Sequence, residues 1–172
     1  MKNVQLSPRK VSKLRFGYIP QIDSGNQYTE RFKGIVSSID GVRLEKIPTK
    51  SDIFRKPFRL LTAINSYDVI FLNWHENRLK SKNQYLTVGS IANFFIAFFY
   101  YKIISRKLIY VVHNSAPQNM SALNSTIAQK LMALVRNWSS IEISHTPSLI
   151  STGVHYVPHP LYKIESFTQN ER

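Results

Sequence analysis

The chain has 172 residues, of which 43% are hydrophobic and 19% are charged; this composition excludes a disordered segment and favours one folded domain. Its 23 Lys and Arg residues outnumber its 10 Asp and Glu residues, which gives a formal net charge of +13 and predicts an anionic partner. The chain contains no cysteine, so disulfides and thiolate metal sites are excluded.

A basic arm over residues 1–13 precedes the first predicted strand. No apolar run of signal-peptide length occurs before Pro20, so we expect a cytoplasmic protein. We expect a single domain over residues 14–162, followed over residues 163–172 by the start of an interdomain linker or by a C-terminal tail.

Short apolar runs alternate with segments of helical character along the first half of the chain. The stretch from Thr29 to Ile39 places apolar residues on one helical face, and the turn formers Asp40 and Gly41 end it. The run VIFL, residues 69–72, is continuously apolar, as in a strand buried on both faces. The predicted order is a strand over 14–19, a helix over 29–39, a strand over 42–47, a short helix over 58–64 and a strand over 67–74.

An aromatic segment, FFIAFFYY at residues 94–101, dominates the second half. It is far shorter than the roughly 20 apolar residues of a membrane-spanning helix, so we expect a buried or interfacial helix. The predicted order continues with a helix over 85–105, a strand over 107–114, a helix over 121–137, a strand over 139–145 and a short strand over 154–160. These elements predict a Rossmann-like three-layer α/β/α domain with a mainly parallel sheet of about six strands.

Polar side chains follow the predicted strands at the points where the strands end. In open parallel sheets, ligands bind outside the carboxyl ends of the strands, so we expect these side chains to share one crevice. The predicted substrate-binding residues are Asp23, Asn26, Asn73, Trp74, His75, Asn114, His145 and His159.

Two further residues at this edge are predicted to be catalytic. A neutral imidazole at His113 can bind a sugar hydroxyl or a phosphate, or polarise a departing group. Glu76 is the best-placed carboxylate to accept a proton from a hydroxyl nucleophile, with Asp23 second, and Trp74 can stack on a sugar ring. The alternatives are a strand or helix cap at His113, a solvated Glu76 and a Trp74 packed in the core.

The sequence contains no motif for a metal ion or a dinucleotide. HExxH does not occur, and the histidines stand singly on separate strands. The first strand leads into QIDSGNQY instead of GxGxxG, and neither GxxxxGKS nor GxxxxGKT occurs. We therefore predict no metal and no cofactor.

Lys and Arg residues are spread along the chain and interleaved with aromatic residues such as Phe54 and Phe58. This arrangement favours an anionic membrane surface over a nucleic-acid groove, with a solvated basic face as the alternative. Because nucleic-acid binding rests on charge alone, we expect no nucleic-acid partner.

Five segments occur in the order YIPQIDSGNQY, a strand ending in NWHEN, a strand ending in VVHN with a proline soon after, a strand with ISH, and VPHPLY. This succession resembles the N-terminal domain of GT-B glycosyltransferases, and it is most similar to bacterial enzymes of capsular and exopolysaccharide assembly. The resemblance runs from about Leu14 to Tyr162.

The resemblance implies two Rossmann-like domains that face each other across a cleft. The N-terminal domain receives an acceptor, often a lipid-pyrophosphate-linked sugar, and the C-terminal domain binds a nucleotide sugar. His113 corresponds to the family's HN position beside the donor sugar, His159 to the turn before the interdomain linker, and Glu76 to the acceptor side. The implied location is peripheral, at the inner face of the bacterial plasma membrane.

The sequence departs from the family after VPHPLY, where only KIESFTQNER follows. The acidic and glycine-rich elements that hold the nucleotide in the family have no counterpart in this sequence. We therefore expect an incomplete transferase whose donor is held by a missing C-terminal domain or by a partner chain. The alternative is a non-catalytic basic module that binds a membrane surface or recruits a partner.

Overall fold

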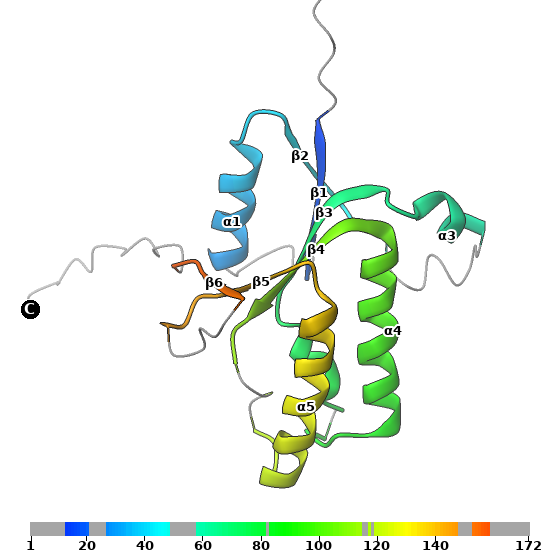
Figure 1. Cartoon of the computed structure of the whole chain (residues 1–172), viewed down its shortest axis with the longest axis vertical. Coiled ribbons are helices and arrows are strands. Elements are labelled where there is room, and N and C mark those ends of the chain that lie inside the picture. The colour runs from blue at the N-terminus through cyan, green and yellow to red at the C-terminus, as the bar shows by residue number, and fades with distance from the viewer. Residues whose placement is uncertain are drawn as a thin grey trace, which may run out of the picture.

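The structure, a computed structural model, describes residues 13–20, 27–48, 58–81, 83–114, 117, 119–147 and 153–158. Six strands form one sheet in the order β2-β1-β3-β4-β5-β6, and every neighbouring pair is parallel. The predicted Rossmann-like α/β fold is therefore confirmed (Figure 1). The elements are β1 (Leu14–Ile19), α1 (Gln27–Ser37), β2 (Val42–Glu45), α3 (Phe58–Ala63), β3 (Tyr67–Leu72), the 3-10 helix η1 (His75–Leu79), α4 (Val88–Ile104), β4 (Ser105–Val112), α5 (Ala122–Trp138), β5 (Ile141–Ser144) and β6 (Val154–Tyr156).

The strand order reverses direction beside β1. The chain leaves β1 for β2 on one side and returns to β3 on the other side, and each later strand is added outward from β3. At the reversal, the backbone N–H of Asn73 donates to the carbonyl of Ile19 at 2.9 Å. In doubly wound parallel sheets, ligands bind at the carboxyl edge where the order reverses. The ends of β1 and β3 are therefore the position at which this fold favours a ligand.

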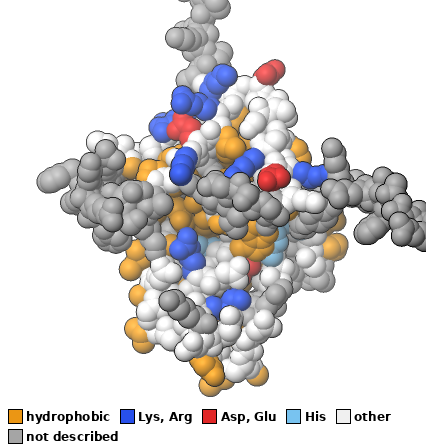
Figure 2. Space-filling model, turned by 180° about the vertical axis from the view of Figure 1, so that it is seen from behind, with side chains coloured by type: hydrophobic (Ala, Val, Ile, Leu, Met, Phe, Trp, Pro, Cys, Tyr) orange, Lys and Arg blue, Asp and Glu red, His pale blue; other side chains and the backbone are white. Residues whose placement is uncertain are grey.

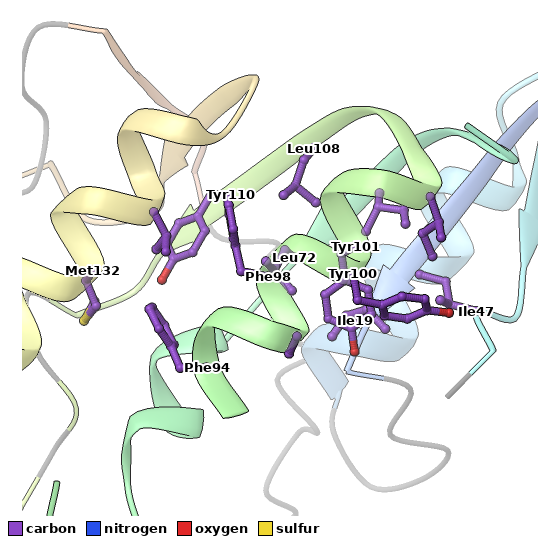
Figure 3. Close-up of a cluster of buried hydrophobic side chains, with 14 of the residues drawn as sticks. Ile19, Ile47, Leu72, Phe94, Phe98, Tyr100, Tyr101, Leu108, Tyr110 and Met132 are labelled. Carbon is purple, nitrogen blue, oxygen red and sulfur yellow. The ribbon is translucent and has the colours of Figure 1, made fainter. Parts of the chain in front are cut away.

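Two hydrophobic cores lie on the two faces of the sheet. Helices α4 and α5 cover one face and α1 covers the other (Figure 1). On β3, Ile70 and Leu72 belong to the core under α4 and α5, whereas Phe71 belongs to the core under α1. Figure 3 shows the larger core, in which Phe94 and Phe98 of α4 lie against side chains of the sheet. Burial on both faces explains the continuous apolar run in β3.

Helix α4 begins at a capping box. The Thr87 hydroxyl accepts the N–H of Ser90 at 3.1 Å, and the Ser90 hydroxyl accepts the N–H of Thr87 at 2.9 Å. These bonds satisfy N–H groups that have no partner within the first turn of a helix. The helix therefore begins at Val88, later than the predicted start at Tyr85.

Other differences from the predicted elements are small. Strand β1 has the predicted bounds, the other five strands end earlier than predicted, and the 3-10 helix η1 follows β3 in addition to the predicted elements. The turn at Asp40 and Gly41 is confirmed, since Gly41 has a φ of 79° that favours glycine. Residues 1–12 and 159–172 lie outside the described residues, so the basic arm and the C-terminal tail stay predictions.

Gly17 on β1 lies against buried side chains of the larger core. A Cβ atom at this position would lie 2.6 Å from Ile47 Cδ1 and 3.2 Å from Ile70 Cγ1. Both isoleucines are at most 1% exposed, so neither can move without disturbing its neighbours. We expect Gly17→Ala to lower the free energy of unfolding by about 1–3 kcal/mol, as measured by urea denaturation.

The matched control is Gly34→Ala on α1. No atom of the described part outside the chain neighbours and the backbone of the same helix lies within 4 Å of a Cβ at Gly34. Because alanine favours helix more than glycine does, this change should raise the free energy of unfolding by about 0.5–1 kcal/mol. Equal effects of the two substitutions would contradict the close packing at Gly17.

Candidate functional site

A pocket of about 430 Å³ opens at the carboxyl ends of β1 and β3, where the strand order reverses. Its volume lies within the range of about 300–1,000 Å³ typical of small-molecule sites. The pocket is lined by Ile19, Pro20, Asn73, Trp74, His75, Asn77 and Arg78. Three of the predicted substrate-binding residues, Asn73, Trp74 and His75, therefore lie around one pocket.

Trp74 adopts a left-handed backbone conformation, with φ 49° and ψ 31°. This conformation is unfavourable for a residue with a bulky side chain, and such strain is concentrated at functional sites. The half-buried indole stacks on the His113 imidazole, with ring centroids 5.1 Å apart, and meets the edge of the Tyr28 ring at 5.5 Å. The turn after β3 thus brings Trp74 together with side chains from α1 and from the end of β4.

Asn73 determines the position of the proton on His113. The buried Asn73 Nδ2 donates to the Tyr18 hydroxyl at 2.9 Å, and this hydroxyl pairs with Thr29 Oγ1 at 3.4 Å. Burial raises the pKa of Tyr18, so its hydroxyl stays protonated. Asn73 Oδ1 then accepts from His113 Nε2, which places the lone pair of the neutral imidazole on Nδ1. A chain of hydrogen bonds from buried side chains therefore holds His113 in one tautomer.

His145 lies beside His113, with ring centroids 5.2 Å apart. Its Nδ1 donates to the backbone carbonyl of Val157 at 2.7 Å, so its Nε2 accepts from the Tyr28 hydroxyl, also at 2.7 Å. The four rings of Tyr28, Trp74, His113 and His145 are named the aromatic cluster below. This cluster joins α1 to the carboxyl ends of β3, β4 and β5.

His75 and Glu76 follow Trp74 directly but lie among residues of the core under α4 and α5. Each of the two is 1% exposed. His75 also lines part of the pocket, but its Nε2 donates to the Phe94 carbonyl at 3.1 Å, and the two rings pack with centroids 4.6 Å apart. The predicted sharing of one crevice by the polar residues after β3 therefore does not extend to Glu76, which is buried and is absent from the pocket lining.

Glu76 is a buried carboxyl group close to Tyr110. Burial raises the pKa of Glu76 to about 7, while its own backbone N–H, the Asn114 amide and Lys80 lower it by smaller amounts. Neither carboxylate oxygen makes a hydrogen bond of good geometry within the described part of the chain. Burial and the charge of Glu76 both raise the pKa of Tyr110 well above its usual value. In this conformation Glu76 does not reach open solvent, and its catalytic role stays a prediction.

The remaining predicted site residues are placed only in part. Asn114 follows β4, is half-buried and lies near Glu76. Asp23, Asn26 and His159 lie outside the described residues. Their predicted contacts with substrate therefore stay predictions.

Sequence reasoning did not identify Tyr28 and Arg78 as site residues. Tyr28 lies near the start of the helix that follows the first strand. Its position at the carboxyl edge of the sheet is the feature of the sequence that could have indicated a site residue. Arg78 comes directly after the NWHEN segment, but in the sequence it is one of many basic residues spread along the chain. The structure places Tyr28 in the aromatic cluster and Arg78 in the pocket lining.

Ion pairs lie near the opposite, amino edge of the sheet. Asp68 accepts the backbone N–H of Arg15 at 2.8 Å and pairs with Arg106 at 3.4 Å.

Figure 2 shows Lys and Arg side chains spread over one face with few acidic side chains among them, and hydrophobic and His side chains near its middle. A surplus of positive charge is therefore visible across this face.

Comparison with protein-family models, with curated proteins and with solved structures found no match. Of the helices in the described ranges, none combines the length and the apolar composition of a membrane span. The same residues include no group of three or more His, Cys, Asp or Glu side chains that could hold a metal ion. The fold, the pocket and the aromatic cluster are the features from which a function can be inferred.

Proposed function

We propose that this chain is the acceptor-binding half of a GT-B glycosyltransferase that acts in bacterial surface polysaccharide synthesis. The observation that carries the proposal is the pocket at the carboxyl edge of β1 and β3, which shares Trp74 with the aromatic cluster. A sugar site needs an aromatic surface and a few convergent polar groups, and this edge offers both. The resemblance of the segments from YIPQIDSGNQY to VPHPLY to N-terminal domains of that family favours the same function.

His113 is the residue proposed to act on the reacting groups. Because Asn73 holds the Nε2 proton, Nδ1 can accept the proton of an acceptor hydroxyl near neutral pH. The acceptor oxygen then forms a bond to the anomeric carbon of the donor sugar, and the bond to the nucleoside diphosphate breaks. Glu76 is given no contact with substrate in this proposal, because its carboxyl group is buried in the core under α4 and α5.

The two substrates lie on different domains in the proposed enzyme. The acceptor is a lipid-linked saccharide, bound to the domain described here at the inner face of the plasma membrane. The donor is a nucleotide sugar, held by a second Rossmann-like domain on a longer form of the chain or on a partner chain.

The proposal is tested by reconstitution. The chain is combined with a candidate donor-binding domain, a panel of nucleotide sugars and a lipid-linked saccharide acceptor in vesicles, and the glycosylated acceptor is detected by mass spectrometry. We expect product only when all components are present. Absence of product in every combination would contradict the proposed function.

A second candidate function, a non-catalytic module that binds an anionic membrane surface, is favoured by exposed apolar side chains on α4 and α5. Ile96, Phe99 and Ile103 repeat at helical spacing on α4 and are between 42% and 48% exposed. Phe99 contacts Trp138 at the end of α5, with ring centroids 5.4 Å apart, and Lys102 donates to the Trp138 carbonyl. Apolar and basic side chains on one surface suit an interfacial position.

This second function predicts that the double variant Phe99→Ser, Ile103→Ser binds phosphatidylglycerol vesicles at least about tenfold more weakly, because it removes apolar area from the contact. Vesicle sedimentation measures the change. The matched control is Ile35→Ser. Ile35 lies on α1, which covers the opposite face of the sheet, and its side chain is 55% exposed. This variant should bind the vesicles as tightly as the wild type. Equal binding by all three proteins would exclude α4 as the membrane contact.

A further inference from the structure

We propose that the pocket at the ends of β1 and β3 binds a phosphate group and that Arg78 is its anchor. The inference rests on the proposed function and deepens it, since it identifies the chemical group of the substrate that the pocket recognises. Three features of the site support this assignment: the positive charge of the pocket lining, the contacts of Tyr101 with the Arg78 guanidinium, and the volume of the pocket.

The lining of the pocket has a net positive charge. Among the described residues that form it, Arg78 carries the one permanent charge, and no carboxylate lies among them. In the described part of the chain, the ion pairs of other arginines use Glu45, Asp68 and Glu142, and none of these pairs includes Arg78. The paired arginines are Arg15, Arg43, Arg106 and Arg136. The positive charge of Arg78 is therefore not balanced by a described carboxylate.

Tyr101 of α4 orients the guanidinium of Arg78. Arg78 Nη2 donates to the Tyr101 hydroxyl at 3.3 Å, and the guanidinium carbon lies 6.0 Å from the centre of the Tyr101 ring. Burial raises the pKa of Tyr101, so the hydroxyl is neutral and accepts this bond without cancelling the charge. A guanidinium has five N–H donors in a fork that matches an anion such as phosphate, and Tyr101 uses one of them.

The other lining residues suit a ring that is attached to the phosphate. Trp74 contributes an indole and the exposed Asn77 contributes an amide, whereas the buried Asn73 amide binds Tyr18 and His113. A pocket of about 430 Å³ has room for a monosaccharide ring together with a phosphate. Because the chain carries a net charge of +13, its field favours a phosphate over the less highly charged carboxylate. The ligand class is therefore a phosphate ester with a polar ring or a headgroup attached.

The test is a binding measurement on the whole chain by isothermal titration calorimetry. The probes are a hexose 1-phosphate, the same hexose without phosphate, and glucuronate as a carboxylate of similar size. We expect the hexose 1-phosphate to bind most tightly and Arg78→Gln to weaken its binding by about tenfold or more, because a charge-assisted hydrogen bond is lost. Arg78→Lys should recover part of the affinity, since it restores the charge without the fork.

The matched control is Arg106→Gln, which removes the same charge at the amino edge of the sheet, where Arg106 pairs with Asp68. The affinity of this variant for the hexose 1-phosphate should stay within about twofold of the wild type. The Arg106 charge is exposed at the opposite edge of the sheet from the pocket, so salt screens its effect on the ligand. Equal weakening by both substitutions, equal affinity for glucuronate, or no binding of any phosphate probe would overturn the proposal.

A second arm identifies the source of the phosphate. Vesicles that contain phosphatidylglycerol are compared with the soluble hexose 1-phosphate. Arg78-dependent binding of the soluble probe indicates a sugar phosphate, and Arg78-dependent binding of the vesicles alone indicates a lipid headgroup; each supports the phosphate assignment. Because neither arm includes a transfer step, failure of phosphate binding and failure of the transferase reaction are distinguishable.

Discussion

Glu76→Gln is expected to stabilise the folded chain by up to about 3 kcal/mol above neutral pH. The Glu76 carboxyl is 1% exposed, and neither of its oxygens makes a hydrogen bond of good geometry within the described residues. An ionised carboxylate in such a place loses its hydration without compensation. Glutamine keeps the size of the side chain and removes the charge.

The pH dependence of this effect has a definite sign. Burial raises the pKa of Glu76 from 4.5 to about 7 in the folded chain, so the folded state binds the proton more tightly than the unfolded state. The stability contributed by protonated Glu76 is fully present below pH 4.5 and is lost as the pH rises through about 7. The difference in stability between variant and wild type is therefore small near pH 4.5 and largest above pH 7.

Urea denaturation over this pH range measures the difference. The matched control is Glu30→Gln, at an exposed side chain in the first turn of α1; it should change the free energy of unfolding by no more than about 0.5 kcal/mol at any pH. A loss of stability in Glu76→Gln above neutral pH would contradict the burial of a charged group at this position. The same pH dependence in both variants would contradict it as well.

The fold could be predicted because its signals are local. The apolar run at residues 69–72 predicts a strand buried on both faces, and the structure places neighbouring residues of this run in opposite cores. The pair Asp40 and Gly41 predicts the turn after the helix; α1 ends at Ser37, and Gly41 has a positive φ in the turn that leads into β2. The gathering of His113 and His145 at one edge follows from parallel strands that all end there.

The arrangement of the side chains after β3 could not be predicted from such local patterns. Trp74 and His75 are neighbours in the sequence, yet one stacks in the aromatic cluster and the other packs in the core under α4 and α5. The left-handed φ of Trp74 and the packing of α4 on η1 produce this division, and both depend on tertiary structure. The same holds for the contact between Asn73 and His113, which joins residues 40 positions apart.

His113→Ala is expected to lower the rate of sugar transfer in the reconstituted reaction by about a hundredfold to ten-thousandfold, the range for loss of a positioned acid–base group. The variant removes the ring whose Nε2 is fixed by Asn73 and whose face stacks on Trp74. The matched control is His155→Ala on β6, where the side chain is exposed, and its rate should stay within about twofold of the wild type. Circular dichroism and urea denaturation of both variants check that the domain remains folded.

The most direct test is the rate of transfer from a nucleotide sugar to a lipid-linked saccharide by the chain together with a donor-binding domain. We predict transfer with the wild type and with His155→Ala, and loss of nearly all transfer with His113→Ala in a protein that still folds. Transfer at the wild-type rate by His113→Ala would contradict the assignment of His113 and of the cluster around it as the catalytic site.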